Sequence, residues 1–145
     1  MKSTAPNVAR PLLLDTCAAI WLTQDAPLSD AAVAALDTSA DNGDSLHVSP
    51  YMALEIGLLA SRGRLNLAMN PHQWFKRLLA IPLVGLADMS PDILIASSYL
   101  PGEPPRDPAD RVVIATAREL GLTVLTRDRL ILDYAAKGHV QAIAC

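Results

Sequence analysis

Short apolar runs alternate with longer stretches in which hydrophobic and polar positions mix. Brief runs that are apolar on both faces are typical of buried strands in a parallel sheet. The run Leu12-Leu13-Leu14 before Asp15 is the clearest example. On this basis we expect strands over residues 12–15, 46–48, 82–86, 122–126 and 140–144.

The segments between these runs carry signals for helix starts. A capping residue followed by proline fits the first turn of a helix, because proline there loses no intrahelical hydrogen bond. This signal occurs at Ser49-Pro50, Asn70-Pro71, Ser90-Pro91 and Asp107-Pro108, and Ser29 is a cap without proline. The predicted helices cover residues 16–23, 31–36, 50–61, 71–80, 91–100, 108–120 and 130–136.

Alternating strands and helices predict an α/β domain: a central parallel sheet of about four to five strands with helices on both faces. A chain of 145 residues, 51% of them hydrophobic, suits one domain with a substantial core. We expect a loose leader over residues 1–10 and the domain over 11–145. No apolar run approaches the roughly 20 residues that cross a bilayer, and the start shows no signal peptide.

Charge and cysteine content narrow the function classes. The net charge of −3 argues against nonspecific binding of nucleic acid, although nine arginines against three lysines favour forked contacts with phosphate. A GC-rich genome explains the arginine excess equally well. The two cysteines show no disulfide framework, which predicts a reduced, cytoplasmic protein.

Four carboxylates stand beside apolar segments, where charge is costly: Asp15, Glu55, Asp110 and Asp128. Like charges brought together there repel by up to about 4 kcal/mol per pair at roughly 4 Å and an effective dielectric constant of about 20. A divalent cation removes this penalty, so the pattern predicts a metal site built from oxygen ligands. Asp15 and Asp128 follow predicted strands, and ligand sites of parallel sheets gather at the carboxyl ends of strands.

Each carboxylate also has an ordinary structural explanation. Asp107 and Asp110 fit the cap and the third position of a helix, where acids stabilise the helix dipole. Glu55 has apolar neighbours one turn away, but it can stand at the rim of a buried helix face or pair with an arginine. Asp15 and Asp128 can simply end a strand or cap a turn.

Other catalytic motifs are missing from the sequence. It has no phosphate-binding glycine loop, no G-x-G-x-x-G and no G-x-S-x-G. The three histidines lack the spacing of zinc ligands. Cys17, one turn before Trp21, is expected to be a small core residue rather than a nucleophile.

Four segments together resemble the PIN-domain ribonucleases, in the toxin branch of VapBC-type toxin–antitoxin systems. The resemblance covers nearly the whole chain, from residue 12 to about 143. Histidine is common in that family where Cys17 and Pro105 stand in this sequence. The segments are LLLDTCAAIWL (12–22), VSPYMALE (48–55), RDPADRVVIATA (106–117) and LTRD (125–128).

The resemblance implies a PIN-like fold and endonucleolytic cleavage of RNA that depends on Mg²⁺ or Mn²⁺. Its acidic quartet falls on Asp15, Glu55, Asp110 and Asp128, with Asp107 as a secondary ligand. It also implies a homodimer inhibited by a small cognate antitoxin. We expect Asp15 and Asp110 to be direct ligands of one or two ions.

Cations near the acids would offset their repulsion of a polyanion. The expected substrate contacts are Arg106, Arg111, Arg127, Arg129, Thr16 and Thr126, with Arg62 and Arg64 extending the path. Arg111 and Arg127 can instead pair with Asp107 or Asp110, and the two hydroxyls can instead position a carboxylate. Other readings are a non-catalytic binding protein, a nuclease acting on single-stranded DNA and, more remotely, a phosphatase of the haloacid dehalogenase type.

Overall fold

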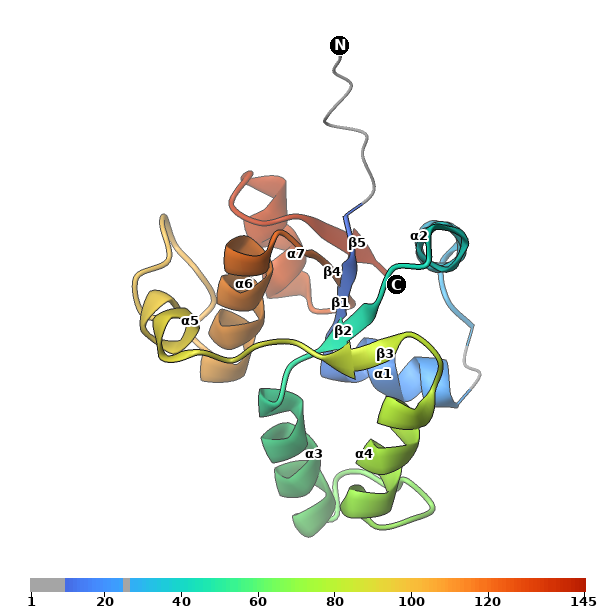
Figure 1. Cartoon of the computed structure of the whole chain (residues 1–145). Helices are drawn as coiled ribbons and strands as arrows, with labels where there is room; N and C mark the ends of the chain where they lie inside the picture. The colour runs from blue at the N-terminus through green and yellow to red at the C-terminus, as the bar shows by residue number, and fades with distance from the viewer. Residues whose placement is uncertain (1–9, 25–26) are drawn as a thin grey trace.

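Five parallel strands form the centre of the molecule in the order β3-β2-β1-β4-β5 (Figure 1). The computed structural model describes residues 10–24 and 27–145, so the leader expected over 1–10 lies outside it except for Arg10. The predicted α/β sheet is confirmed, although each strand is shorter than or equal to its apolar run. The strands are β1 (Leu12–Leu14), β2 (Leu46–Val48), β3 (Val84–Leu86), β4 (Thr123–Thr126) and β5 (Ala142–Ala144).

Helices occupy every segment in which the sequence predicts one. Their bounds are α1 (Thr16–Thr23), α2 (Asp30–Asn42), α3 (Tyr51–Ser61), α4 (Pro71–Ala80), α5 (Pro91–Ala96), α6 (Pro108–Leu120) and α7 (Arg129–Ala136). Helix α2 runs six residues past its expected end at Leu36 and stops at Gly43, which adopts a left-handed φ of 70°. Helix α5 ends early, where the Ser97 hydroxyl donates to the Leu94 carbonyl oxygen at 2.6 Å.

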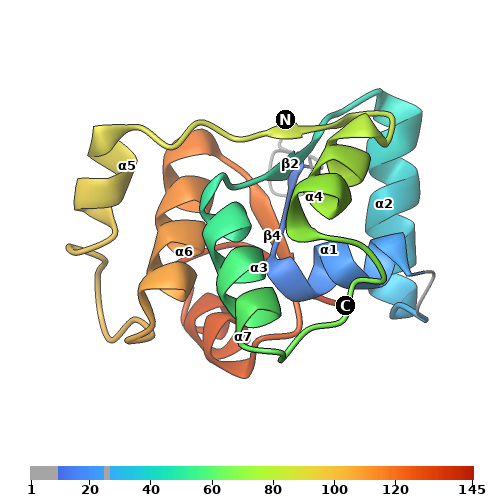
Figure 2. The same cartoon turned by 90° about the horizontal axis from the view of Figure 1, so that it is seen from below.

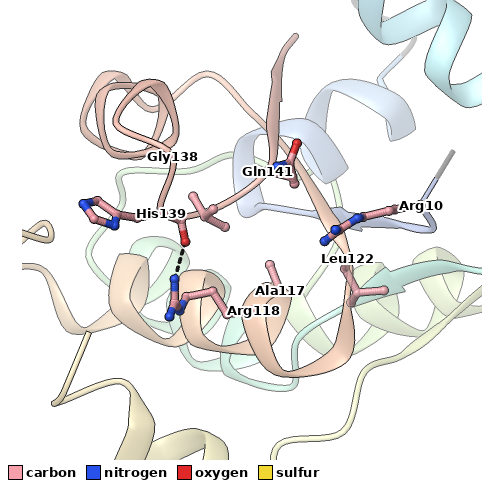
Figure 3. Close-up of a pocket in the computed structure, with 8 residues that line it drawn as sticks. Arg10, Ala117, Arg118, Leu122, Gly138, His139 and Gln141 are labelled. Atoms are coloured by element: carbon pink, nitrogen blue, oxygen red, sulfur yellow. Dashed lines mark hydrogen bonds between the residues drawn. The ribbon is translucent and has the colours of Figure 1, made fainter. Parts of the chain in front are cut away.

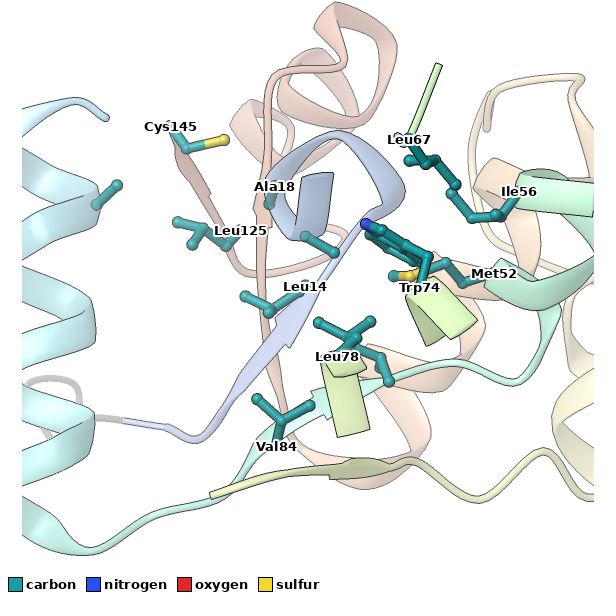
Figure 4. Packing of buried hydrophobic residues seen from close by; sticks show 13 residues of the cluster. Leu14, Ala18, Met52, Ile56, Leu67, Trp74, Leu78, Val84, Leu125 and Cys145 are labelled. Atoms are coloured by element: carbon teal, nitrogen blue, oxygen red, sulfur yellow. The ribbon is translucent and has the colours of Figure 1, made fainter. Parts of the chain in front are cut away.

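The sheet separates two apolar cores because successive side chains of a strand point to opposite faces. Leu14 packs on one face with α1, α2, α3 and α4, where Trp74 and Leu78 are among the most buried side chains (Figure 4). Leu13 packs on the other face with α6 and α7. Figure 2 shows α1, α2 and α4 to one side and α5 and α6 to the other, with α3 and α7 between them.

Chain direction brings four segments to the carboxyl edge of the sheet. Strands β1 and β4 are neighbours, with Leu14 opposite Leu125, so the residues that follow them meet there. Helix α3 begins just after β2, and α6 contacts α3 and runs back toward the start of β4. The first turns of both helices therefore reach the edge at which β1 and β4 end.

Residues 10–24 and 27–145 contain no helix with the length and apolar character needed to traverse a lipid bilayer.

Candidate functional site

Asp15 is the most buried carboxylate of the carboxyl edge, with 8% of its surface exposed. Its position directly after β1 makes it the cap of α1, and its Oδ1 accepts a hydrogen bond from the Ala18 amide at 2.8 Å. Its Oδ2 accepts a hydrogen bond from the Thr126 hydroxyl. Burial raises the pKa of Asp15 above its usual 3.8, although these two hydrogen bonds oppose the rise.

Asp128 is tied to Asp15 through the same threonine. The Asp128 amide donates to Thr126 Oγ1 at 2.9 Å, while Asp128 Oδ1 caps α7 by accepting from the amides of Leu130 and Ile131. Thr126 is completely buried. One hydroxyl therefore fixes the relative positions of two acids that are 113 residues apart in the sequence, at 15 and 128.

Glu55 approaches the site from the second turn of α3. Its Oε1 accepts a hydrogen bond from the Thr16 hydroxyl at 2.7 Å, which links α3 to α1. Burial raises the pKa of Glu55 most, and the charges of Asp107, Asp15 and Asp128 raise it further. The side chain lies at the rim of a buried helix face, because Met52 is buried whereas Leu58 is 41% exposed.

Asp107 and Asp110 occupy the first turn of α6. Asp107 is the predicted cap, and its Oδ1 accepts from the Ala109 amide at 2.9 Å. The pKa of Asp110 is raised from 3.8 to about 7, first by burial and then by the charges of Asp128, Asp107, Glu55 and Asp15. Helix capping explains the position of Asp107. It does not explain why Asp110 lies where burial and neighbouring charges disfavour its ionised form.

The five acids form one group, named here the acidic cluster: Asp15, Glu55, Asp107, Asp110 and Asp128. Four of them raise the pKa of the fifth, Asp110, so their charges are close enough to repel. A cluster of oxygen donors with uncompensated negative charge suits a hard divalent cation. Within the part of the chain that is described, however, no three such side chains stand close enough to ligate one ion together. Sharing an ion therefore requires side-chain rotation.

The threonines expected to contact substrate have other partners. Thr126 cannot reach a substrate because it is completely buried behind Asp15. Thr16 uses its hydroxyl on Glu55. Both therefore fit the alternative reading from the sequence, in which a hydroxyl positions a carboxylate.

Arg127, expected among the phosphate contacts, is exposed but also binds other parts of the chain. Its Nε donates to the Cys145 carbonyl oxygen at 2.7 Å, and its guanidinium lies over the ring of Trp21. A further N–H group reaches the Pro27 carbonyl oxygen at 3.4 Å. The guanidinium thus joins α1, the segment before α2 and the end of β5. The sequence does not predict these contacts of Arg127, because the partners are backbone carbonyl groups and an aromatic ring far away in the sequence.

The other three arginines of the expected set are placed differently from one another. Arg106 and Arg129 are exposed beside Asp107 and Asp128. Arg111 is partly buried, and its Nε donates to the Pro105 carbonyl oxygen at 2.7 Å rather than to a neighbouring acid. Cys17, expected in the core, is exposed, because it lies on the outward face of α1 beside the buried Ala18 and Ala19.

Comparisons with known proteins identify the family. The family model described as the PIN domain matches residues 12–137. Ribonuclease VapC22 of Mycobacterium tuberculosis is 33% identical over 125 residues, which cover 85% of this chain and 91% of that protein.

Two solved structures are similar in fold. VapBC2 from Rickettsia felis, bound to a DNA fragment from its promoter, matches with a TM-score of 0.65 at 13% identity over 92% of this chain and 97% of that one. FitAcB from Neisseria gonorrhoeae matches with a TM-score of 0.54 at 22% identity over 91% of this chain and 96% of that one.

Proposed function

We propose that this chain, which belongs to the PIN-domain family, is a divalent-metal-dependent endoribonuclease and the toxin of a toxin–antitoxin pair. The observation that carries the proposal is the acidic cluster, in which Asp110 has a pKa of about 7 because burial and four neighbouring carboxylates act on it together. Structural acids alone do not require such a concentration of charge, and perturbed groups of this kind gather at functional sites.

The residues present fit Mg²⁺ or Mn²⁺, since every donor of the acidic cluster is a carboxylate oxygen. Asp15 and Asp110 would be the direct ligands, with Glu55 and Asp128 completing the site and Asp107 secondary. A bound ion supplies Lewis-acid chemistry for hydrolysis of a phosphodiester bond.

The chain itself restrains the acids through hydrogen bonds. Thr126 holds the Asp15 carboxylate and the Asp128 backbone amide, and Thr16 holds the Glu55 carboxylate, so the side-chain rotations needed to share an ion would start from restrained positions. The raised pKa of Asp110, about 7, belongs to the metal-free protein, and a cation bound beside the carboxyl group would favour its ionised form.

RNA would be held through its phosphates. Arg106 and Arg129 flank the acidic cluster and are exposed, so their guanidinium groups can bind phosphate oxygens in pairs. Aromatic residues make up only 4% of the chain, which limits base stacking. Recognition of a single-stranded or loop conformation fits these features better than reading of a duplex groove.

The partner we propose is a small antitoxin protein, acting on a homodimer of this chain. The names of the solved structures VapBC2 and FitAcB place similar folds in toxin–antitoxin complexes. Co-expression of the short reading frame adjacent to this gene is expected to relieve growth arrest. Growth arrest that persists despite the neighbour's product would remove the proposed partner and leave the nuclease proposal intact.

Cleavage by the purified protein tests the activity. We expect it to cut single-stranded RNA with Mg²⁺ or Mn²⁺, to stop with a chelator and to leave matched DNA intact. Asp15→Asn is expected to reduce the rate more than about 100-fold, because even residues that support a metal ligand are worth 10–100-fold. The matched control is Asp133→Asn, an exposed acid of α7, which should keep the wild-type rate. Equal cleavage by both variants would refute the assignment of the acidic cluster.

A further inference from the structure

The connection between α5 and α6 leads directly into the acidic cluster. It includes Pro101-Gly102-Glu103-Pro104-Pro105 and ends at Asp107, the cap of α6. Proline has no amide hydrogen, so this stretch cannot be held by a regular backbone ladder. Side chains of α6 and α7 reach its carbonyl groups instead.

Tyr134 supplies the first of these contacts. It lies on α7 with 2% of its surface exposed, and its hydroxyl donates to the Pro101 carbonyl oxygen. Its ring packs against His139, with the ring centroids 4.7 Å apart and the planes at 31°. A buried tyrosine thus uses its polar end on one carbonyl of the connection.

His139 supplies a steric contact with the next residue. Gly102 has a φ of +68°, and a Cβ added there would lie 2.8 Å from His139 Nε2. Only glycine fits this conformation and this approach without strain. Figure 3 shows Arg118 donating to the His139 carbonyl oxygen, beside a pocket also lined by Arg10 and Gln141, while the imidazole points away from that pocket.

Arg111 fixes the other end of the same stretch. From the first turns of α6, its Nε donates to the Pro105 carbonyl oxygen at 2.7 Å. The connection is therefore held at Pro101 by α7 and at Pro105 by α6, immediately before Asp107 and Asp110.

We propose that Tyr134 is a positioning residue: by holding Pro101 it sets the path of the 101–107 connection and so the placement of Asp107 and Asp110 in the acidic cluster. This inference rests on the proposed metal-dependent function. The Tyr134 hydroxyl donates to the Pro101 carbonyl oxygen and not to an acid of the cluster, so its effect on the acids would pass through the backbone. Arg111 supports the same path but is also a candidate phosphate contact, so Tyr134 gives the cleaner test.

Tyr134→Phe removes the hydroxyl and keeps the ring packing on His139. Calorimetric titration of the full chain with Mn²⁺ is expected to show binding about 10-fold weaker than in the wild type, at the lower end of the range for residues behind a metal ligand. Hydrogen exchange at the Ala109 amide, which Asp107 holds, is expected to become faster. Tyr99→Phe is the matched control, because Tyr99 is 82% exposed, and should change neither quantity.

Gly102→Ala provides a second variant, since the added Cβ pushes the connection away from His139. It should weaken Mn²⁺ binding in the same direction. Mn²⁺ affinity within twofold of the wild type in both folded variants would overturn the proposal, even if their melting temperatures fall, because Tyr134 would then serve stability alone. Absence of Mn²⁺ binding by the wild type would overturn it too, whereas absence of RNA cleavage alone would overturn only the proposed activity.

Discussion

The Thr126 hydroxyl donates to Oδ2 of Asp15 across the boundary between β4 and β1. The same oxygen accepts the Asp128 amide at 2.9 Å. Thr126, which is uncharged and has no exposed surface, thus forms a hydrogen bond with the carboxylate of Asp15 and another with the backbone amide of Asp128. This relationship makes Thr126 part of the support of the acidic cluster and gives the first prediction.

Thr126→Val removes the hydroxyl while keeping the shape of the side chain. It leaves an Asp15 oxygen and the Asp128 amide without this partner, so we expect a loss of about 1–3 kcal/mol in unfolding free energy. Cleavage should fall by about 10-fold or more, as for other residues that support a ligand. Denaturant unfolding and initial rates measure the two effects.

Thr116→Val is the matched control for that substitution. Thr116 is equally buried, but its hydroxyl donates within α6 to the Val112 carbonyl oxygen at 2.6 Å, away from the acids. It should keep the cleavage rate of the wild type. Equal losses of activity in both variants would mean that buried threonines act here through stability only.

Glu55→Gln tests the acid contributed by α3. Glutamine keeps the oxygen that accepts from Thr16 but carries no charge, so the helix contact should survive. We expect the cleavage rate to drop by at least about 10-fold while the melting temperature stays the same or rises, because repulsion from Asp107, Asp15 and Asp128 is relieved. A melting temperature that falls would show that the charge of Glu55 stabilises the fold.

Asp110 predicts a specific dependence of stability on pH. Its pKa of about 7 in the folded protein exceeds the ordinary 3.8, so the folded state holds the proton more tightly than the unfolded chain. The stabilisation from this group is therefore complete below about pH 4 and is lost as pH rises through 7. Without added metal, Asp110→Asn should raise the melting temperature at pH 8 by about 2–4 °C and change it less at pH 5. The partial exposure of Asp110 keeps the effect modest.

Divalent cations should stabilise the protein through the same charges. Mg²⁺ or Mn²⁺ bound to the folded state raises the melting temperature by mass action. The increase should be larger at pH 8 than at pH 5, because protons compete for the carboxylates at low pH. Scanning fluorimetry with and without chelator measures it, and K⁺ at equal ionic strength controls for screening. An equal rise in K⁺ would exclude a specific ion site.

Substitution of Arg106 or Arg129 should affect RNA binding, whereas substitution of Arg127 should affect stability. Arg106→Ala and Arg129→Ala are expected to weaken RNA binding and to reduce its dependence on salt, since both side chains are exposed beside the acids. Arg127→Ala should lower the melting temperature instead, because it removes contacts to Cys145 and Trp21. If RNA binding weakens equally in all three variants, Arg127 also contacts the RNA phosphates.

The alternation of strands and helices was readable from sequence because local chemistry determines it. Caps such as Asn70 and Ser90 accept helix amides where the pattern predicts, and Gly121 ends α6 with a φ of 68°. The end of α2 was not readable, because the polar residues after Leu36 remain helical until Gly43 permits a left-handed turn. Local residue preferences therefore predict the start of a helix better than its end, which also depends on packing in the folded protein.

The sequence predicted which acids belong to the candidate site, but it did not predict which side chains surround and hold them. A carboxylate beside an apolar run is visible in the sequence because it contradicts the pattern, as Asp15 and Glu55 do. The direction in which Arg127 points depends on Trp21 and on the end of β5, more than 100 residues and 18 residues away respectively. Such contacts exist only once the chain has folded, so residue type and spacing do not encode them visibly.

Pairing of β1 with β4 brings residue 14 opposite residue 125. Contacts of such large sequence separation form late and slowly, because a long loop must close before they contribute. During synthesis β1 can pair early with β2, but β4 becomes available only when most of the polypeptide exists. A prematurely terminated product lacking β4 has neither Asp128 nor the buried hydroxyl beside Asp15, so we expect the cell to be spared nuclease activity from incomplete chains.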